Sequence, residues 1–334
     1  MSRKLAISVD WQGSFDRARL LERVALADAV GVDSVWVPEA WGRDCFTLLT
    51  QLAERTQRIR LGTGIVNVYS RTPAALAQHF ATLDELSAGR MVAGFGTSGA
   101  QVIEHFHGVR FEPSLTRMKE TIEIFNMLIR HEPLHYHGRL FHLERGFTLR
   151  FAPPRPHVPV HLATLNPKAL DLTASHADGW LPVMIPIEKL AGEVSAMRAR
   201  ISGAGRDPAA FEIHAPGGIV VASGTARSRA EMAHAGTIAF YVGRMGVYYT
   251  RQLERFGFGK EVAAIKEAWQ RGSAAAAAAV PAAMRERLGT VGDVAACRER
   301  IAAEAAAGAD IHRVQVATED SSEYTRTLER LLEA

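Results

Sequence analysis

Cysteine is scarce in this sequence of 334 residues. The two cysteines, Cys45 and Cys297, lie far apart and form no C-x-x-C pair, so the sequence indicates neither a zinc site nor a disulfide framework. Disulfides occur mainly in secreted proteins. This composition is therefore typical of a protein in a reducing compartment, and we expect a cytoplasmic protein.

Long apolar runs and a strong net charge are also missing. No stretch of about 18 apolar residues occurs, and the start of the chain lacks the apolar region of a signal peptide, so we expect neither membrane insertion nor export. The 39 Lys and Arg residues oppose 36 Asp and Glu residues, which gives a net charge of +3. The basic residues are scattered and form no stripe, so we expect no nucleic-acid partner.

Several catalytic and metal-binding patterns are absent or weak. There is no G-x-S-x-G elbow and no Ser/His/Asp spacing, which disfavours nucleophilic hydrolysis. Four histidines lie close together in the sequence, far from the predicted strand ends: His131, His135, His137 and His142. A solvated hairpin is therefore favoured over a metal site, and we expect no bound metal.

What the sequence does contain is a regular alternation of short apolar runs and helical patterns. The runs predict eight strands, at 5–9, 34–37, 59–66, 91–95, 158–163, 179–183, 213–221 and 311–316. Helical periodicity is found at 16–30, 73–86, 115–129, 168–177 and 294–307. This repetition predicts an α/β protein with a parallel sheet, and its length favours a (β/α)₈ TIM barrel over a doubly wound sheet.

The barrel is expected to form one domain over residues 1–334, with two departures from the repeat. A proline-rich segment at about 131–159 reads as a strand-rich insertion, and extra polar helices are expected at about 240–290. The alanine run at 274–279 is a strong helix former that carries no chemical signal, and Pro281 should start or break a helix. Active sites of such barrels lie at the carboxyl ends of the strands.

The most informative of these strand ends is the glycine-rich turn Gly94-Phe95-Gly96-Thr97-Ser98-Gly99. It spells G-x-G-x-x-G, but the segment 101–113 is polar and broken, and helical periodicity resumes only after it. A dinucleotide fingerprint needs a helix at the third glycine, so a phosphate-binding loop of another α/β fold is the better interpretation.

A second glycine pair lies in the third predicted strand, within Gly62-Thr63-Gly64-Ile65-Val66-Asn67. Glycine inside a strand usually marks a bulge or a close approach of another backbone. The alternative is a strand that bends only to close the barrel.

Two carboxylates follow the first and second strands, where they could serve as an acid and a base. They are Asp10 and Glu39, and helix-capping or turn roles are the alternative for both.

Several motifs in this order resemble one known family. They are residues 35–42 (VWVPEAWG), 61–67 (LGTGIVN), 71–73 (RTP), 82–90 (TLDELSAGR), 96–99 (GTSG), 166–168 (NPK) and 178–182 (DGWLP). The chain resembles the bacterial-luciferase-like superfamily, and within it the branch that uses the deazaflavin coenzyme F420, such as the methylenetetrahydromethanopterin reductases. The resemblance runs essentially end to end, and it implies a (β/α)₈ barrel that assembles as a homodimer.

The resemblance also implies roles for individual residues in cofactor binding. Gly64 and Ile65 match a non-proline cis peptide in a bulge that supports the middle deazaflavin ring, and Asn67 matches a ring-contacting position. Two further loops match those that hold the side chain and phosphate of the cofactor: Thr97, Ser98 and Gly99 in one, and Thr164, Leu165 and Asn166 in the other.

For the reaction itself, the resemblance points to Glu39, which would hydrogen-bond the cofactor or relay a proton. Ala40 stands where relatives carry a histidine, which argues against a histidine-dependent sugar-phosphate or secondary-alcohol dehydrogenase. Trp11 and Trp41 are expected to line an apolar pocket for a small-molecule substrate.

The sequence thus predicts an F420-dependent oxidoreductase that transfers a hydride between the deazaflavin and an organic substrate. Two alternatives remain: an FMN-dependent luciferase-like monooxygenase, and a barrel that binds a flavin-type ligand without turnover. We expect the dimer to form through the helices that follow the second and third strands, where four alanines permit close packing: Ala74, Ala75, Ala77 and Ala81.

Overall fold

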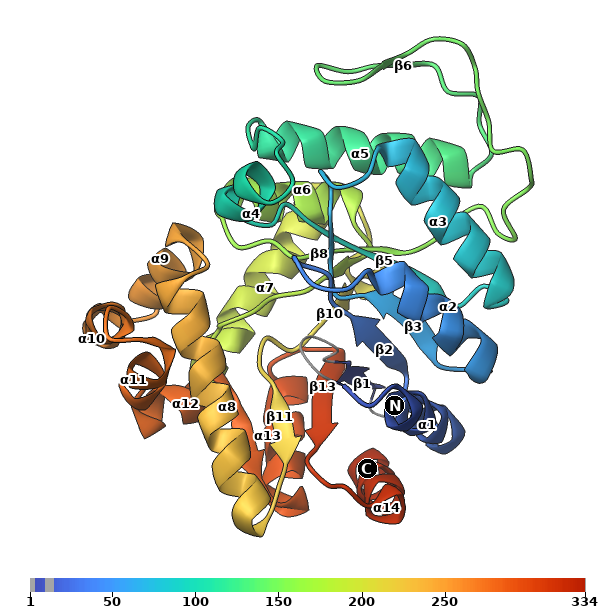
Figure 1. The fold of residues 1–334 in the computed structure, drawn as a ribbon. Helices are drawn as coiled ribbons and strands as arrows, with labels where there is room; N and C mark the ends of the chain where they lie inside the picture. The colour runs from blue at the N-terminus through green and yellow to red at the C-terminus, as the bar shows by residue number, and fades with distance from the viewer. Residues whose placement is uncertain (1–3, 10–14, 334) are drawn as a thin grey trace. The chain divides into compact units, whose positions relative to one another are not determined.

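The computed structural model describes residues 4–9 and 15–333, which form two compact units. The N-terminal unit comprises residues 8–9, 15–164 and 171–180, and the C-terminal unit comprises 4–7, 165–170 and 181–333. Figure 1 shows the ribbon, coloured by residue number, with many of its helices and strands labelled.

The N-terminal unit is built around a parallel sheet. Its strands lie in the order β9 (Gly179–Trp180), β8 (Val160–Leu162), β5 (Met91–Gly96), β3 (Arg60–Thr63) and β2 (Ser34–Val37), and β4 (Val66–Asn67) also pairs with β5. Its helices are α1 (Arg17–Val30), α2 (Cys45–Arg55), α3 (Pro73–Leu86), α4 (Ala100–His105) and α5 (Ser114–Ile129), and α6 (Pro167–His176) is divided between the two units.

Local sequence signals explain where several of these helices begin. Asp16, Asp44 and Thr72 cap α1, α2 and α3 with side-chain oxygens that accept a backbone N–H three residues later, and Pro73 occupies the first turn of α3. The helix α4 begins directly after Gly99, in a segment that we expected to be irregular. With six residues, it is too short to show helical periodicity in the sequence.

Three phenylalanines form the aromatic core of this unit. Phe80 of α3, Phe95 of β5 and Phe125 of α5 meet edge to face, with ring centroids 5.4–5.6 Å apart. All three side chains are fully buried. The helices α3 and α5 therefore lie side by side over the sheet (Figure 1).

The insertion contains the short antiparallel hairpin β6 (Tyr136–His137) and β7 (His142–Leu143), as its composition predicted. The buried carboxylate of Glu120 on α5 anchors the turn of this hairpin, because it accepts N–H groups from Arg139, Leu140 and Phe141 at 2.6–3.1 Å.

The C-terminal unit has its own parallel strands, in the order β1 (Lys4–Ser8), β13 (Ile311–Val316), β11 (Ile219–Val221) and β12 (Thr290–Gly292). The segment 213–221, predicted as one strand, is split into β10 (Glu212–Ile213) and β11. The reason is Pro216-Gly217-Gly218, since proline cannot donate to a ladder and glycine weakens a strand. The three-residue strand β12 was not predicted.

Helices make up most of the remainder of this unit. They are α7 (Ile187–Gly203), α8 (Gly224–Gly243), α9 (Val247–Arg255), α10 (Gly259–Trp269), α11 (Ser273–Ala278), α12 (Ala282–Leu288), α13 (Val294–Ala306) and α14 (Ser321–Leu332). The alanine run forms α11, and Pro281 precedes α12, as predicted. Of the helices in the described ranges, none is long and apolar enough to cross a membrane.

The prediction that four alanines of α3 form a dimer surface is wrong for two of them. Ala77 and Ala81 are fully buried within their own chain, where α3 packs against neighbouring elements. Ala74 and Ala75 are half-buried. An interface that uses this helix would have to use its other faces.

Asp28, at the end of α1, links that helix to the loop before β3. Its carboxylate accepts N–H groups from Gln57, Arg58 and Ile59 at 2.6–2.8 Å. Burial opposes the charge, but these hydrogen bonds outweigh it and hold the pKa of Asp28 below its usual value of 3.8. Ionised Asp28 therefore stabilises the fold above this value, and that stabilisation is lost as the pH falls through the lowered pKa.

We expect Asp28→Asn to lower the free energy of unfolding by about 1.5–3 kcal/mol at neutral pH, the usual contribution of hydrogen bonds to a charged group. The difference from wild type should shrink in acid, because wild-type Asp28 then becomes protonated. Urea unfolding at several pH values measures both effects. A difference that stays constant with pH would contradict this role.

Candidate functional site

The predicted bulge lies between β3 and β4. Gly62 pairs with Val92 of β5, whereas Val66 pairs with Phe95, so four steps along one strand face three steps along the other. One extra residue is therefore inserted around Gly64 and Ile65, which defines a β-bulge.

The Gly64–Ile65 bond itself is trans, so the predicted cis peptide is wrong. Within the described ranges, the cis peptide is Glu112–Pro113. The trans bulge is held by hydrogen bonds on both sides: Gly64 N–H donates to Val37 O at 2.8 Å, and Glu39 N–H donates to Ile65 O at 3.2 Å.

Two glycines of the G-x-G-x-x-G turn serve strand packing rather than ligand binding. A Cβ on Gly94 would lie 1.9 Å from the carbonyl oxygen of Thr63, and a Cβ on Gly96 would lie 2.3 Å from Cδ1 of Ile65. The side chain of Ile65 thus lies across Gly96, which connects the bulge to β5. Gly62 is explained in the same way, because a Cβ there would lie 2.5 Å from Cε3 of the Trp36 ring.

The part of the turn that remains available for a ligand is Thr97-Ser98-Gly99. Within the part of the chain that the structure describes, the N–H groups of these three residues donate to no protein acceptor. Ser98 has a positive φ of 59°, and the Thr97 hydroxyl donates to Ser98 O at 3.2 Å. Such a loop of free N–H groups fits an anionic group such as phosphate.

Asn67 lies at the end of β4, next to this loop. It pairs with Gly96 in the sheet, and its side chain is buried. Its Oδ1 accepts N–H groups from Tyr69 and Ser70 at 3.0 and 2.7 Å, and its Nδ2 lies 3.4 Å from Nε2 of His107. The amide is therefore fixed in orientation, and a histidine borders it.

Glu39 follows β2 and forms an ion pair with Arg71. Its Oε1 accepts from Nη1 of Arg71 at 2.6 Å, and its Oε2 accepts from Nη2 at 3.1 Å and from the N–H of Cys45 at 3.0 Å. The exposed fractions are 8% for the Glu39 side chain and 17% for Arg71. Both carboxylate oxygens thus accept hydrogen bonds from neighbouring residues.

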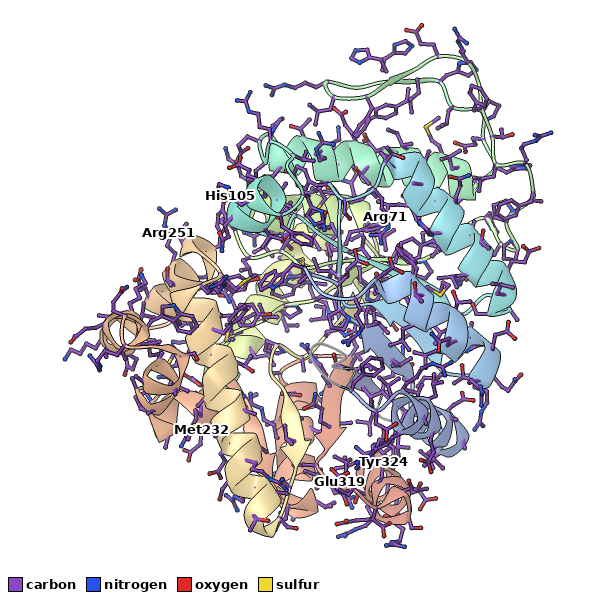
Figure 2. The ribbon with its side chains drawn as sticks, viewed as in Figure 1. Arg71, His105, Met232, Arg251, Glu319 and Tyr324 are labelled. Carbon is purple, nitrogen blue, oxygen red and sulfur yellow. The ribbon has the colours of Figure 1, made fainter. Side chains whose placement is uncertain are left out.

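Arg71 is the centre of a wider charged group, and Figure 2 labels it. It also binds Asp44, it donates to the Ser70 hydroxyl at 3.2 Å, and its guanidinium lies over the ring of Phe46. Burial acts against its charge, but the hydrogen bonds to Glu39 outweigh burial and raise the pKa of Arg71. The sequence gives no sign of this role for Arg71, because an ion pair between residues 32 positions apart has no local signal.

The second predicted loop follows β8. The Thr164 hydroxyl lies 2.7 Å from that of Thr173, and Thr164 O accepts from the indole of Trp180. Oδ1 of Asn166 accepts from Ala169 N–H at the start of α6, and Leu165 is half-buried. The side chains of Thr164 and Asn166 are therefore engaged within the protein.

The structure thus gathers Glu39, Ile65, Asn67, Thr97 and Thr164 at the carboxyl ends of adjacent strands, because β2, β3, β5 and β8 are neighbours in one parallel sheet. Trp41 follows β2 and is 40% exposed, and Ala40 is exposed beside it. Asp10 and Trp11 lie outside the described residues. In those ranges, no three His, Cys, Asp or Glu side chains are grouped so as to hold a metal ion.

Comparison with known proteins agrees with this architecture. Residues 6–310 match the luciferase-like monooxygenase family. A protein of Mycobacterium tuberculosis named as a putative coenzyme F420-dependent oxidoreductase is 32% identical over 98% of this chain and 99% of its own length. The 5,10-methylenetetrahydromethanopterin reductase of Archaeoglobus fulgidus is 35% identical over 47% of each chain.

Among solved structures, the coenzyme F420-dependent tetrahydromethanopterin reductase of Methanopyrus kandleri superposes with a TM-score of 0.83, at 21% identity, over 100% of this chain and 98% of that one. This likeness confirms the predicted fold class, the α/β fold of the luciferase-like TIM barrels. The protein belongs to the luciferase-like family.

Proposed function

We propose that this protein is an F420-dependent oxidoreductase that passes a hydride between the deazaflavin and an electrophilic carbon of an organic substrate. The observation that carries the proposal is the similarity, over nearly the whole chain, to the oxidoreductase of M. tuberculosis. Bound F420 would supply the hydride chemistry, and the protein would supply binding, orientation and proton transfer.

For cofactor binding, we propose that the free N–H groups of Thr97, Ser98 and Gly99 hold the phosphate. The bulge at Gly64 and Ile65 would support the ring, with the oriented amide of Asn67 beside it. Thr164, Leu165 and Asn166 would form the second loop. Because the side chains of Thr164 and Asn166 have protein partners, backbone groups are the expected donors there.

Hydride transfer to a carbonyl or an activated alkene also requires a proton, and we propose that His107 supplies it. His107 is half-buried beside the Asn67 amide. The nearby Tyr69 is less suitable, because burial raises its pKa and its hydroxyl is bound to Phe111 O. His107 would take the place of the histidine that is missing at position 40.

Glu39 has the complementary role in this proposal. It would hold Arg71 in place at the end of β2 and would not itself carry the proton, because each of its oxygens already accepts a hydrogen bond. Arg71 in turn orients Ser70, whose N–H binds Asn67. Glu39 would therefore position the cofactor-contacting amide through two hydrogen-bonded residues.

Two alternatives remain, and a titration tests the first of them. An FMN-dependent monooxygenase is favoured by the description of the matched family, and a barrel that binds the cofactor without turnover is favoured by Ala40. Purified protein is titrated with F420 and with FMN, and reoxidation of the reduced complex in air is followed. Tight F420 binding with slow reoxidation supports the reductase, whereas FMN binding with rapid oxygen consumption overturns it.

Replacing Gly99 with valine should weaken F420 binding at least tenfold while the protein stays folded. The backbone at Gly99 has φ −110° and ψ 151°, which valine adopts readily, and the nearest atom to a new Cβ is the flexible Gln101 Oε1 at 3.4 Å. The branched side chain would then obstruct the approach of a phosphate to the loop.

The matched control for this prediction is Gly192→Val, because no atom lies within 4 Å of a Cβ at Gly192. Fluorescence titration gives the dissociation constants, and the melting temperature checks folding. Unchanged affinity in a stable Gly99→Val protein would show that the phosphate binds elsewhere.

The proposal includes a cytoplasmic location, a small organic substrate, and a homodimer, with neither nucleic acid nor membrane as a partner. The even charge balance and the scarcity of cysteine support the location and the choice of partner. Sedimentation at micromolar concentration would test the dimer, and a species of 36.4 kDa would contradict it.

A further inference from the structure

A cavity of about 350 Å³ lies wholly within the C-terminal unit, at the carboxyl ends of three parallel strands. Val221 of β11 pairs in register with Gly292 of β12 and with Val316 of β13, so the three strands end level with one another. The strands β11 and β13 lie side by side in Figure 1. The loops that follow the three strands and one side of α14 line the cavity, whose size suits a small molecule.

A buried hydroxyl without a protein partner borders this cavity. Thr327 of α14 is 7% exposed, and in the described part of the chain its hydroxyl forms no hydrogen bond. Thr325, on the same helix, differs in this respect, because its hydroxyl donates to Ser321 O at 2.9 Å. The hydroxyl oxygen of Thr327 is not enclosed by protein atoms, so the cavity is its open side. A buried polar group of this kind requires a partner outside the protein.

Two arginines without ion-pair partners lie on the same side of α14. Arg326 and Arg330 line the cavity one helical turn apart, and both side chains are exposed. Among the residues that the structure describes, neither guanidinium forms a hydrogen bond or an ion pair. Like charges four residues apart destabilise a helix slightly, so the pair would gain from a bound anion. Guanidinium groups bind phosphate and carboxylate through paired N–H groups.

The loops at the strand ends add further hydrogen-bond donors. Asp293 caps α13 by accepting the N–H of Ala296 at 2.9 Å. The N–H groups of Val294 and Ala295 line the same end of the helix and, within the described ranges, have no protein acceptor. Ser223, which precedes α8 and also lines the cavity, has a hydroxyl that caps no backbone group. The start of a helix favours a negative charge, so these donors act together with the arginines.

Two carboxylates also line the cavity, and both accept hydrogen bonds within the protein. Asp293 is the cap of α13, and Glu323 accepts from the hydroxyl of Thr318. In the ranges that the structure describes, neither carboxylate forms an ion pair with Arg326 or Arg330. The groups left without a partner can all donate hydrogen bonds, which favours an anionic ligand.

We propose that this cavity binds the phosphate group of a phosphorylated small molecule other than the cofactor. Phosphate offers more acceptor oxygens than a carboxylate, so it can accept from the arginines, the Thr327 hydroxyl and the helix start together. In TIM barrels, the loops after the seventh and eighth strands often bind phosphate, and here β11 ends the seventh predicted strand and β13 is the eighth. The site is independent of the proposed Thr97 loop, which belongs to the N-terminal unit.

The test compares a phosphate ester with its neutral counterpart. Cofactor-free protein is titrated by calorimetry with glycerol 3-phosphate and with glycerol, and we expect the wild type to bind the ester at least tenfold more tightly. Thr327→Val removes the hydroxyl at nearly constant shape and should weaken binding of the ester about two- to tenfold, the usual contribution of one hydrogen bond. Arg326→Met combined with Arg330→Met should weaken it at least tenfold.

Two matched controls should leave the affinity for the ester unchanged. Thr325→Val alters a threonine of the same helix whose hydroxyl is bonded to its own backbone, and Arg229→Met alters an exposed arginine of α8 away from the cavity lining. Melting temperatures confirm that each variant is folded. Equal affinity for the ester and glycerol in the wild type would overturn the proposal. Selective binding that survives all the α14 substitutions would place the phosphate elsewhere and would also overturn it.

A further titration separates this site from the cofactor. In protein saturated with F420, the wild-type affinity for glycerol 3-phosphate should persist, and the α14 variants should bind F420 as the wild type does. If F420 displaced the ester and the arginine substitutions weakened F420 binding, the cavity would hold the phosphate of the cofactor, and the proposal would fall. A protein that binds the ester here but does not bind F420 would remove the proposed oxidoreductase activity and keep this site.

Discussion

Replacement of Gly94 by alanine is expected to abolish stable folding of the chain. A Cβ at this position would lie 1.9 Å from the carbonyl oxygen of Thr63, a backbone atom that cannot move without breaking the sheet. The Thr63 hydroxyl also bonds both backbone groups of Gly94, at 2.8 Å each. We expect a loss of more than about 4 kcal/mol, which is exceptional for one substitution.

The control for Gly94 is Gly99→Ala, five residues along the same turn. Its Cβ would meet only the end of the Gln101 side chain, at 3.4 Å, so its stability should stay within about 1 kcal/mol of wild type. Soluble yield and urea denaturation measure both variants. A folded Gly94→Ala protein with wild-type stability would show that β3 and β5 approach less closely than described.

Replacement of His107 by glutamine should lower the rate of hydride transfer by about 10²–10⁴-fold, the usual contribution of general acid–base catalysis. Glutamine keeps a hydrogen-bonding side chain beside Asn67 but cannot donate a proton in this way, so F420 affinity should change little. The single-turnover rate is followed by deazaflavin absorbance, once a substrate has been identified.

Glu39→Gln is the matched comparison for His107. If Glu39 only holds Arg71, glutamine should reduce the rate less than about tenfold, below the range of acid–base catalysis, and the pH dependence of the rate should persist. The opposite pattern, in which Glu39→Gln lowers the rate strongly and His107→Gln lowers it little, would assign the proton transfer to Glu39.

Much of the fold was predictable because periodic patterns act locally. The predicted strand 34–37 and the predicted helix 73–86 agree with β2 and α3 to the residue, since buried apolar runs and a Thr-Pro helix start are strong signals. Short elements were missed or merged, such as α4, β12 and the pair β10 and β11. A strand of two or three residues and a helix of six residues are too short to establish a period.

The candidate site was predictable in part. The order of the strands follows from the barrel pattern, so the placement of Glu39, Asn67 and Thr97 at one edge of the sheet could be expected. The partners of these residues could not be expected, because Arg71 meets Glu39, and His107 meets Asn67, only through the folded loops. The roles of the turn glycines could not be expected either. Gly94 and Gly96 lack a Cβ because Thr63 and Ile65 occupy the space that it would need.

The sequence by itself determined the alternation of strands and helices, the family, and the position of the bulge, because each depends on residue types at short spacing. Only the tertiary structure decided that the bulge peptide is trans, that Gly94 and Gly96 are packing residues, and that Glu39 is held by Arg71. Whether a charge is paired depends on which distant segments surround it, and no local pattern records that.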